Sequence, residues 1–139
     1  DYVGKDLILD KLKKINGVIF PMYIGNDLFL DNLEEAQNLT LPKIVRRHTY
    51  LKKLKKYKDL TLPEESDYIY LGQLEVAKNP LYVKNIKIFD AFNLMDISGL
   101  KLSREMTEDR FFVPGVTLDE LTYNGEAYYT NEKQLIKHR

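Results

Sequence analysis

Side chains that could carry catalysis are sparse in this chain of 139 residues. It has no cysteine and two histidines, His48 and His138, and neither has a serine or carboxylate at a spacing typical of catalytic triads or metal-binding helices. The seven glycines are scattered singly, so no phosphate-binding loop is expected. The sequence therefore predicts a protein that is not an enzyme and has no catalytic residue, metal site or cofactor.

Aromatic side chains give the clearest signal for binding. They recur about 21 positions apart as Phe29, Tyr50 and Tyr70. Such rings bring a large contact area at low conformational cost, which protein partners and sugars both exploit. The alternative interpretation is that aromatic residues are good strand formers that pack sideways on each other.

A basic cluster accompanies these rings in the sequence. The segment from Lys43 to Lys58 contains no acidic residue. Phosphates or an acidic protein could bind there, although charged runs are usually solvated surface. We predict a binding surface that consists of the three rings with four basic residues at their margin: Phe29, Tyr50, Tyr70, Arg46, Arg47, Lys52 and Lys53.

Repeated units must position these residues. Three consecutive segments, starting at Asp6, Asp27 and His48, align almost without gaps. Their shared pattern is represented by the second unit, with Leu28, Leu30, Leu33, Ala36, Leu39, Leu41 and Pro42. Weaker copies begin near Tyr68 and use Phe89, and a last one follows an insertion around Arg104 to Val113 and uses Val116, Leu118 and Leu121. Self-similarity at this period is typical of stacked supersecondary units.

The repeat pattern predicts the fold class. Two apolar-x-apolar elements per unit place alternate side chains on one face of a short strand, and about 21 residues cannot hold a helical crossover. Each unit should therefore be one coil, and neighbouring coils should join their apolar rows into one core. We predict a single domain, 1–139, that is a β-rich solenoid of about six stacked coils with short parallel strands. The expected coils are 6–26, 27–47, 48–67, 68–87, 88–114 and 115–130, followed by a cap or tail over 131–139.

Two further expectations follow from stacking. The leucines at equivalent places should be almost fully buried in one column: Leu30, Leu33, Leu51, Leu54, Leu71 and Leu74. Charged pairs of alternating sign at Lys13-Lys14, Glu34-Glu35 and Lys55-Lys56 should face each other across coils, with Lys55 within ion-pair reach of Glu34 or Glu75.

The segments DNLEEAQNLTLPKIV and YKDLTLPEES resemble the short leucine-rich-repeat-like solenoids of bacterial and phage proteins, whose units read roughly as a glycine pair, x-L-x-L, x-x-L, several small residues and L-x-L-P. The resemblance covers most of residues 2 to 103. It implies a solenoid that serves as a recognition module. The glycine pair survives only as Gly4 and Gly25, and Arg46 with Arg47, then Ser66 with Asp67, replace it in later units.

The composition limits the classes of partner that we expect. The chain is 44% hydrophobic and 30% charged with zero formal net charge, which argues against disorder and against wholesale nucleic-acid binding. No apolar run approaches the ~20 residues that span a bilayer, so no membrane partner is expected. The lack of cysteine favours the cytoplasm. We expect a fragment of a larger bacterial or phage protein, acting as a non-catalytic binding or structural module for a protein or, second, a glycan. The alternative is a nucleic-acid-associated accessory domain that uses the basic third coil.

Overall fold

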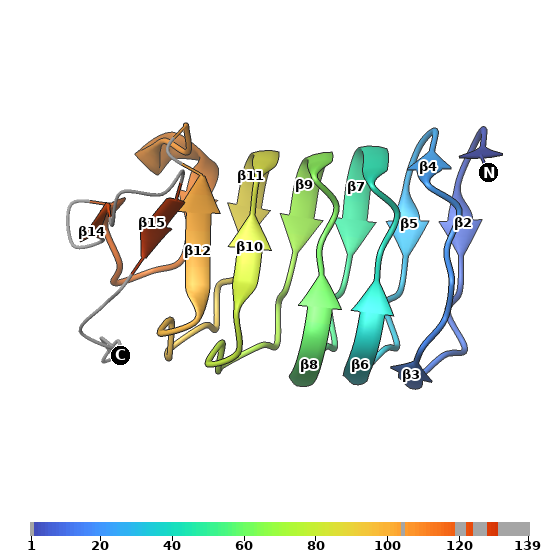
Figure 1. The fold of residues 1–139 in the computed structure, drawn as a ribbon, viewed down its shortest axis with the longest axis horizontal. Coiled ribbons are helices and arrows are strands. Elements are labelled where there is room, and N and C mark those ends of the chain that lie inside the picture. Colours follow the sequence, from blue (N-terminus) through green and yellow to red (C-terminus); the bar gives the residue numbers. More distant parts are fainter. Residues whose placement is uncertain (1, 104, 119–121, 124–127, 131–139) are drawn as a thin grey trace.

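The computed structural model describes residues 2–103, 105–118, 122–123 and 128–130. These residues form a parallel β-solenoid of about five turns, with about 21 residues per turn (Figure 1). The predicted fold class is confirmed, with about five turns where about six coils were expected. The turns stack along one axis, so that the N-terminus lies at one end and β14 and β15 lie at the other (Figure 1).

The largest sheet, here called the long sheet, receives strands from every turn. Its strands are β1 (Tyr2–Val3), β2 (Leu7–Ile8), β4 (Tyr23–Ile24), β5 (Leu28–Phe29), β7 (Ile44–Tyr50), β9 (Glu65–Tyr70), β11 (Asn85–Asp90) and β13 (Phe111–Phe112). All their pairings are parallel and join equivalent repeat places, for example Phe29 with Tyr50 and Tyr50 with Tyr70. Residues that lie one repeat apart in the sequence are therefore paired across neighbouring strands of the sheet.

Two smaller sheets complete the stack. The short sheet contains β3 (Lys14–Asn16), β6 (Glu35–Thr40) and β8 (Lys56–Thr61), all parallel. The C-terminal sheet contains β10 (Leu81–Val83), β12 (Leu100–Ser103), β15 (Tyr128–Thr130) and β14 (Thr122–Tyr123). β10 and β12 are parallel, whereas β15 pairs antiparallel with β12 and with β14. A 3₁₀ turn, η1 (Glu108–Arg110), precedes β13.

The core is the predicted leucine column. Its members have no exposed surface, which confirms the inward assignment: Leu30, Leu33, Leu51, Leu54, Leu71 and Leu74. A tight turn repeats beside it, because the Leu33 N–H donates to the Leu30 carbonyl at 3.2 Å and the Leu54 N–H donates to the Leu51 carbonyl at 3.3 Å. In the first coil the equivalent Leu9 is only partly buried, since among the described residues no coil covers it.

Corner residues show how the chain turns between sheets. Gly17, Asn38 and Asp59 occupy the same place in three successive coils and have φ of 77°, 48° and 56°. Glycine, asparagine and aspartate tolerate this left-handed conformation better than other residues. Asn38 therefore has a structural role, although Asn38-Leu39-Thr40 also fits a glycosylation pattern.

The two arginines that replace the glycine pair lie where the pairing between β7 and β9 is irregular. A Cβ on Gly25 would lie 2.4 Å from the Gly4 carbonyl oxygen, so this place needs glycine when coils pair closely. In the next coil the pairing of β7 with β9 is irregular between Val45 and His48. This irregularity leaves Arg46 and Arg47 exposed at a bulge.

The predicted start of the last coil is wrong. Phe111 pairs with Phe89, and their rings stack with centroids 6.2 Å apart, so β13 already belongs to the long sheet. Val113 and Val116 then repeat the tight turn, with the Val116 N–H donating to the Val113 carbonyl at 3.2 Å. The insertion therefore ends before Phe111, and the segments described after Leu118 run antiparallel. The cap or tail expected over 131–139 lies outside the described residues.

The expected charge alternation is present along the short sheet. Lys55 Nζ lies 3.6 Å from Glu34 Oε1, and Lys14 Nζ lies 3.4 Å from Glu35 Oε2. All four side chains are at least 39% exposed. The prediction for Lys55 is confirmed with Glu34 as its partner, in a setting where each pair stabilises only weakly.

Candidate binding surface

The predicted rings form a row on the outer face of the long sheet. Phe29, Tyr50 and Tyr70, called the aromatic row, come from β5, β7 and β9 and lie side by side in register. The rings of Phe29 and Tyr50 stack with centroids 4.9 Å apart and an interplanar angle of 12°. All three side chains are only partly exposed, because neighbouring rings cover each other. The row continues as Ile8 at one end and as Asp90 and then Phe112 at the other.

A second outward column, which the sequence prediction missed, lies two residues before the aromatic row. It contains Asp6, Asp27, His48 and Tyr68, and His48 pairs with Tyr68 across β7 and β9. Strand periodicity places both columns on one face. The His48 ring contacts the Tyr50 ring edge-on at 5.6 Å and the Tyr68 ring at 5.4 Å.

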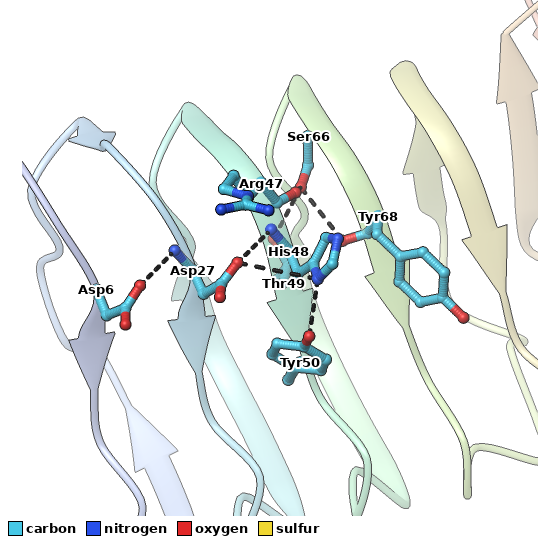
Figure 2. A network of polar contacts seen from close by, with 8 residues as sticks. All are labelled: Asp6, Asp27, Arg47, His48, Thr49, Tyr50, Ser66 and Tyr68. Carbon is cyan, nitrogen blue, oxygen red and sulfur yellow. Dashed lines mark hydrogen bonds and ion pairs between the residues drawn. The ribbon is translucent and has the colours of Figure 1, made fainter.

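Carboxylates of this second column accept hydrogen bonds from the backbone of the next coil (Figure 2). Asp6 Oδ1 accepts a hydrogen bond from the Asp27 N–H at 3.0 Å, and Asp27 Oδ1 accepts one from the His48 N–H at 2.9 Å. Asp27 Oδ1 also lies 3.9 Å from His48 Nδ1. His48 Nδ1 in turn forms a 2.7 Å hydrogen bond with the Tyr50 hydroxyl. Contacts across coils thus fix the ring of Tyr50.

A buried polar pair secures the same strands from the inside. Thr49 occupies an inward place and is fully buried, and its Oγ1 lies 3.1 Å from Ser66 Oγ (Figure 2). Ser66 Oγ also lies within hydrogen-bond distance of the Arg47 carbonyl, at 2.9 Å. The two hydroxyls therefore satisfy each other and the backbone at the bulge.

Tyrosine ionisation is disfavoured on this face. The Tyr68 hydroxyl donates a 2.7 Å hydrogen bond to Asp90 Oδ2, and burial followed by this bond and the Asp90 charge raises the pKa of Tyr68. Burial, and then the negative charges of Asp27 and Asp31, also raise the pKa of Tyr50. Both hydroxyls therefore stay neutral at physiological pH.

The two columns enclose a small hollow, called the ring pocket. It has a volume of about 230 Å³ and is lined by His48, Tyr50, Lys52, Tyr68 and Tyr70. Tyr68 and Tyr70 stack with centroids 6.1 Å apart. The ring of Tyr70 lies over Gly72, where an added Cβ would come within 2.9 Å of Tyr70 Cε1. Gly72 therefore leaves room for the position that the Tyr70 ring adopts.

The structure separates the four basic residues predicted at the margin. Lys52 lines the ring pocket, with Nζ 5.6 Å from the Tyr50 ring centroid. Lys53 Nζ donates to Asn32 Oδ1 at 3.1 Å. Arg46 lines a different hollow of about 240 Å³, together with Glu65, Asp67 and Lys87 among others, and Arg47 is exposed at the bulge. One of the four basic side chains thus joins the rings in a common hollow.

Two classes of site were also sought in the part of the chain that the structure describes. No group of three or more histidine, cysteine, aspartate or glutamate side chains there is arranged to hold a metal ion. No helix among those residues has the length and apolar character needed to cross a bilayer. The ring pocket is a hollow of the described surface where aromatic and polar side chains converge.

Comparison of this chain with protein-family models, with curated proteins and with solved structures gives no match. The parallel β-solenoid and its period of about 21 residues are what the structure itself establishes.

Proposed function

We propose that this protein is a non-catalytic recognition module that binds an extended partner, a protein or a glycan, across the outer face of the long sheet. The observation that carries the proposal is the ring pocket, set in a row of aromatic side chains that coils hold in register. A concave, mostly apolar site with a few convergent polar groups is the usual form of a binding site.

Rigidity supports this assignment. The side chains of His48 and Tyr50 are hydrogen-bonded to each other within one coil, and the Tyr68 hydroxyl donates to Asp90 of the next coil. The backbone N–H of His48 donates to Asp27 of the preceding coil. Preorganised rings lose little conformational freedom when a ligand binds. A purely structural row would need ring packing but would not need a hollow between the rings.

The alternative, nucleic-acid binding through the third coil, has less support. Lys43 Nζ lies 3.6 Å from Glu64 Oε2, and Lys55 pairs with Glu34. These neighbours offset part of the positive charge that phosphates would need. The alternative predicts binding that weakens steeply with salt.

Kinship with the leucine-rich-repeat-like solenoids of bacterial and phage proteins is part of the same proposal. The period, the x-L-x-L element and the proline after the second apolar pair support it. Such a relationship would agree with a recognition role but would not identify the ligand.

Affinity capture from the source cells with immobilised protein tests the recognition role. The wild type and Tyr82→Ala should retain the same partner, whereas Tyr50→Ala should lose it. Tyr82 is a matched control, because it is an exposed tyrosine of the C-terminal sheet with Lys101 Nζ 5.9 Å from its ring. Capture that is equal for all three proteins would contradict the proposal.

The salt dependence of binding then distinguishes the recognition role from nucleic-acid binding. Between about 50 mM and 200 mM salt, a phosphate-dominated complex loses orders of magnitude in affinity, whereas an interface centred on rings changes little. Binding of the purified partner should follow the second course. A steep loss would favour the nucleic-acid alternative.

A further inference from the structure

We infer that the ring pocket is a subsite for one ring of a neutral oligosaccharide. This inference rests on the proposed recognition role and names the chemistry of the ligand. It follows from the volume of the pocket, from the charges around it and from the geometry of its rings.

The volume fits one ring-sized group. Drug-sized ligands occupy sites of roughly 300–1,000 Å³, and the ring pocket encloses about 230 Å³. A ligand seated there must therefore extend beyond the pocket to gain more contact. The aromatic row offers that extension, because Phe29, which belongs to the preceding coil, stacks directly on Tyr50. An oligomer of rings has the required shape.

The charges around the pocket have both signs, which disfavours a charged ligand. Lys52 Nζ already lies 5.6 Å from the Tyr50 ring centroid, so an ammonium ligand on that ring would meet a like charge. An anionic ligand would approach the carboxylates of Asp27 and Asp31, whose effect on the Tyr50 hydroxyl is larger than the opposite effect of Arg47. A neutral polar ligand meets neither repulsion.

The polar groups at the margin suit hydroxyls. Lys52 can only donate hydrogen bonds, whereas the Asp27 carboxylate can only accept them. A hydroxyl both donates and accepts, so a polyhydroxylated ring can use either kind of group. Its C–H faces can at the same time pack on aromatic rings, which combine a large apolar area with a polar tip in tyrosine. A purely apolar ligand would use neither kind of group.

The position of Tyr70 keeps the pocket open. Its ring leans over Gly72, the place that Lys52 occupies in the preceding coil. In Gly72→Ala the new methyl group would approach the ring within contact distance, so the ring must move, while the backbone at this residue needs no left-handed conformation. This substitution therefore perturbs the pocket and not the core.

Calorimetry and saturation-transfer NMR with defined hexasaccharides test the inference. The probes are cellohexaose, mannohexaose and chitohexaose, with a heparin hexasaccharide as anionic probe and a trimethyllysine peptide as cationic probe. At least one neutral hexasaccharide should bind, and saturation should be strongest on the C–H protons of one sugar ring. Glucose, mannose and N-acetylglucosamine should bind more weakly than the hexamers, because the ligand extends along the row.

Variants locate the binding. Tyr50→Ala and Tyr70→Ala should each weaken binding by about tenfold or more, and Gly72→Ala should weaken it while the circular dichroism spectrum stays that of the wild type. Tyr82→Ala should bind as the wild type does. The inference fails if no neutral hexasaccharide binds, if only a charged probe binds, or if the Tyr50→Ala protein binds the saccharide with unchanged affinity.

The two proposals fail separately. If Tyr50→Ala loses a captured protein partner but no saccharide binds, the recognition role stands and the saccharide inference is wrong. If neither a captured partner nor a saccharide depends on Tyr50, both are wrong and the row is a packing feature alone.

Discussion

The long sheet and the short sheet are built by the same coils on the same leucine core, yet their outer faces differ. The long sheet carries rings held by carboxylates and hydroxyls, as in the contact of His48 with Tyr50. The short sheet carries exposed ion pairs, such as that of Lys55 with Glu34. The repeat thus determines the core, whereas the outward places can differ from sheet to sheet. A surface whose aromatic side chains are held in fixed positions is the more suitable of the two for recognition.

The largest expected effect lies in the core that both sheets share. Leu51→Ala should reduce the free energy of unfolding by about 2–5 kcal/mol, because Leu51 is fully buried and the substitution leaves a cavity. Urea denaturation monitored by circular dichroism measures this loss. Lys58→Ala is the control, because Lys58 is exposed on β8. A loss similar to that of the control would mean that the column does not hold the two sheets together.

A smaller loss is expected on the long sheet alone. Asp27→Ala removes the acceptor of the His48 N–H, and a hydrogen bond to a charged group is typically worth about 1.5–3 kcal/mol. Asp27→Asn keeps an oxygen acceptor and should restore most of the stability. Denaturation of the two variants side by side measures the difference. Equal losses would show that charge, and not the hydrogen bond, makes the contribution.

The short sheet should respond weakly and with a dependence on salt. Lys55→Glu replaces an exposed ion pair with a like-charge contact to Glu34, and exposed pairs contribute roughly 0.2–1 kcal/mol. High salt should remove most of the difference from the wild type because it screens exposed charges. A loss of several kcal/mol in the free energy of unfolding that does not change with salt would contradict the contrast between the two faces.

The smallest effect concerns ionisation on the long sheet. Burial and the hydrogen bond to Asp90 raise the pKa of Tyr68, so its folded-state value exceeds the unfolded value of about 10. The associated stability is therefore present below pH of about 10 and is lost as the pH rises further towards the folded-state value. Absorbance titration should show one late-titrating tyrosine fewer in Tyr68→Phe than in the wild type, and Asp90→Asn should shift that group to lower pH. Titration of that group at the usual pH would rule out the bond.

Sequence periodicity predicted the parts of the molecule that repeat residue types. Leu30, Leu51 and Leu71 share a place in the pattern, and the same spacing aligned Phe29 with Tyr50. The coil and the aromatic row therefore followed from strand alternation and stacking alone. The last coil was misplaced, because an insertion interrupts the spacing and hides the equivalence of Phe111 with Phe89.

The ring pocket could not be predicted from the sequence. The second column begins with two aspartates, Asp6 and Asp27, but continues as His48 and Tyr68, so no shared residue type marks the column where the pocket forms. The irregular pairing at the Arg46–Arg47 bulge also shifts the spacing between coils by one. The separation of the four basic residues depends on side-chain partners such as Asn32, which sequence distance does not reveal.

The change of strand direction at β15 has a consequence for assembly. In a stack of parallel coils each edge is a template for the next strand, so a molecule with two such edges could elongate end to end into fibres. β15 takes up the free edge of β12 with the opposite chain polarity. A second molecule that arrives at this side finds the edge of β12 already paired, and the strand left at the margin of the sheet, β14, offers two residues for pairing where β12 has four.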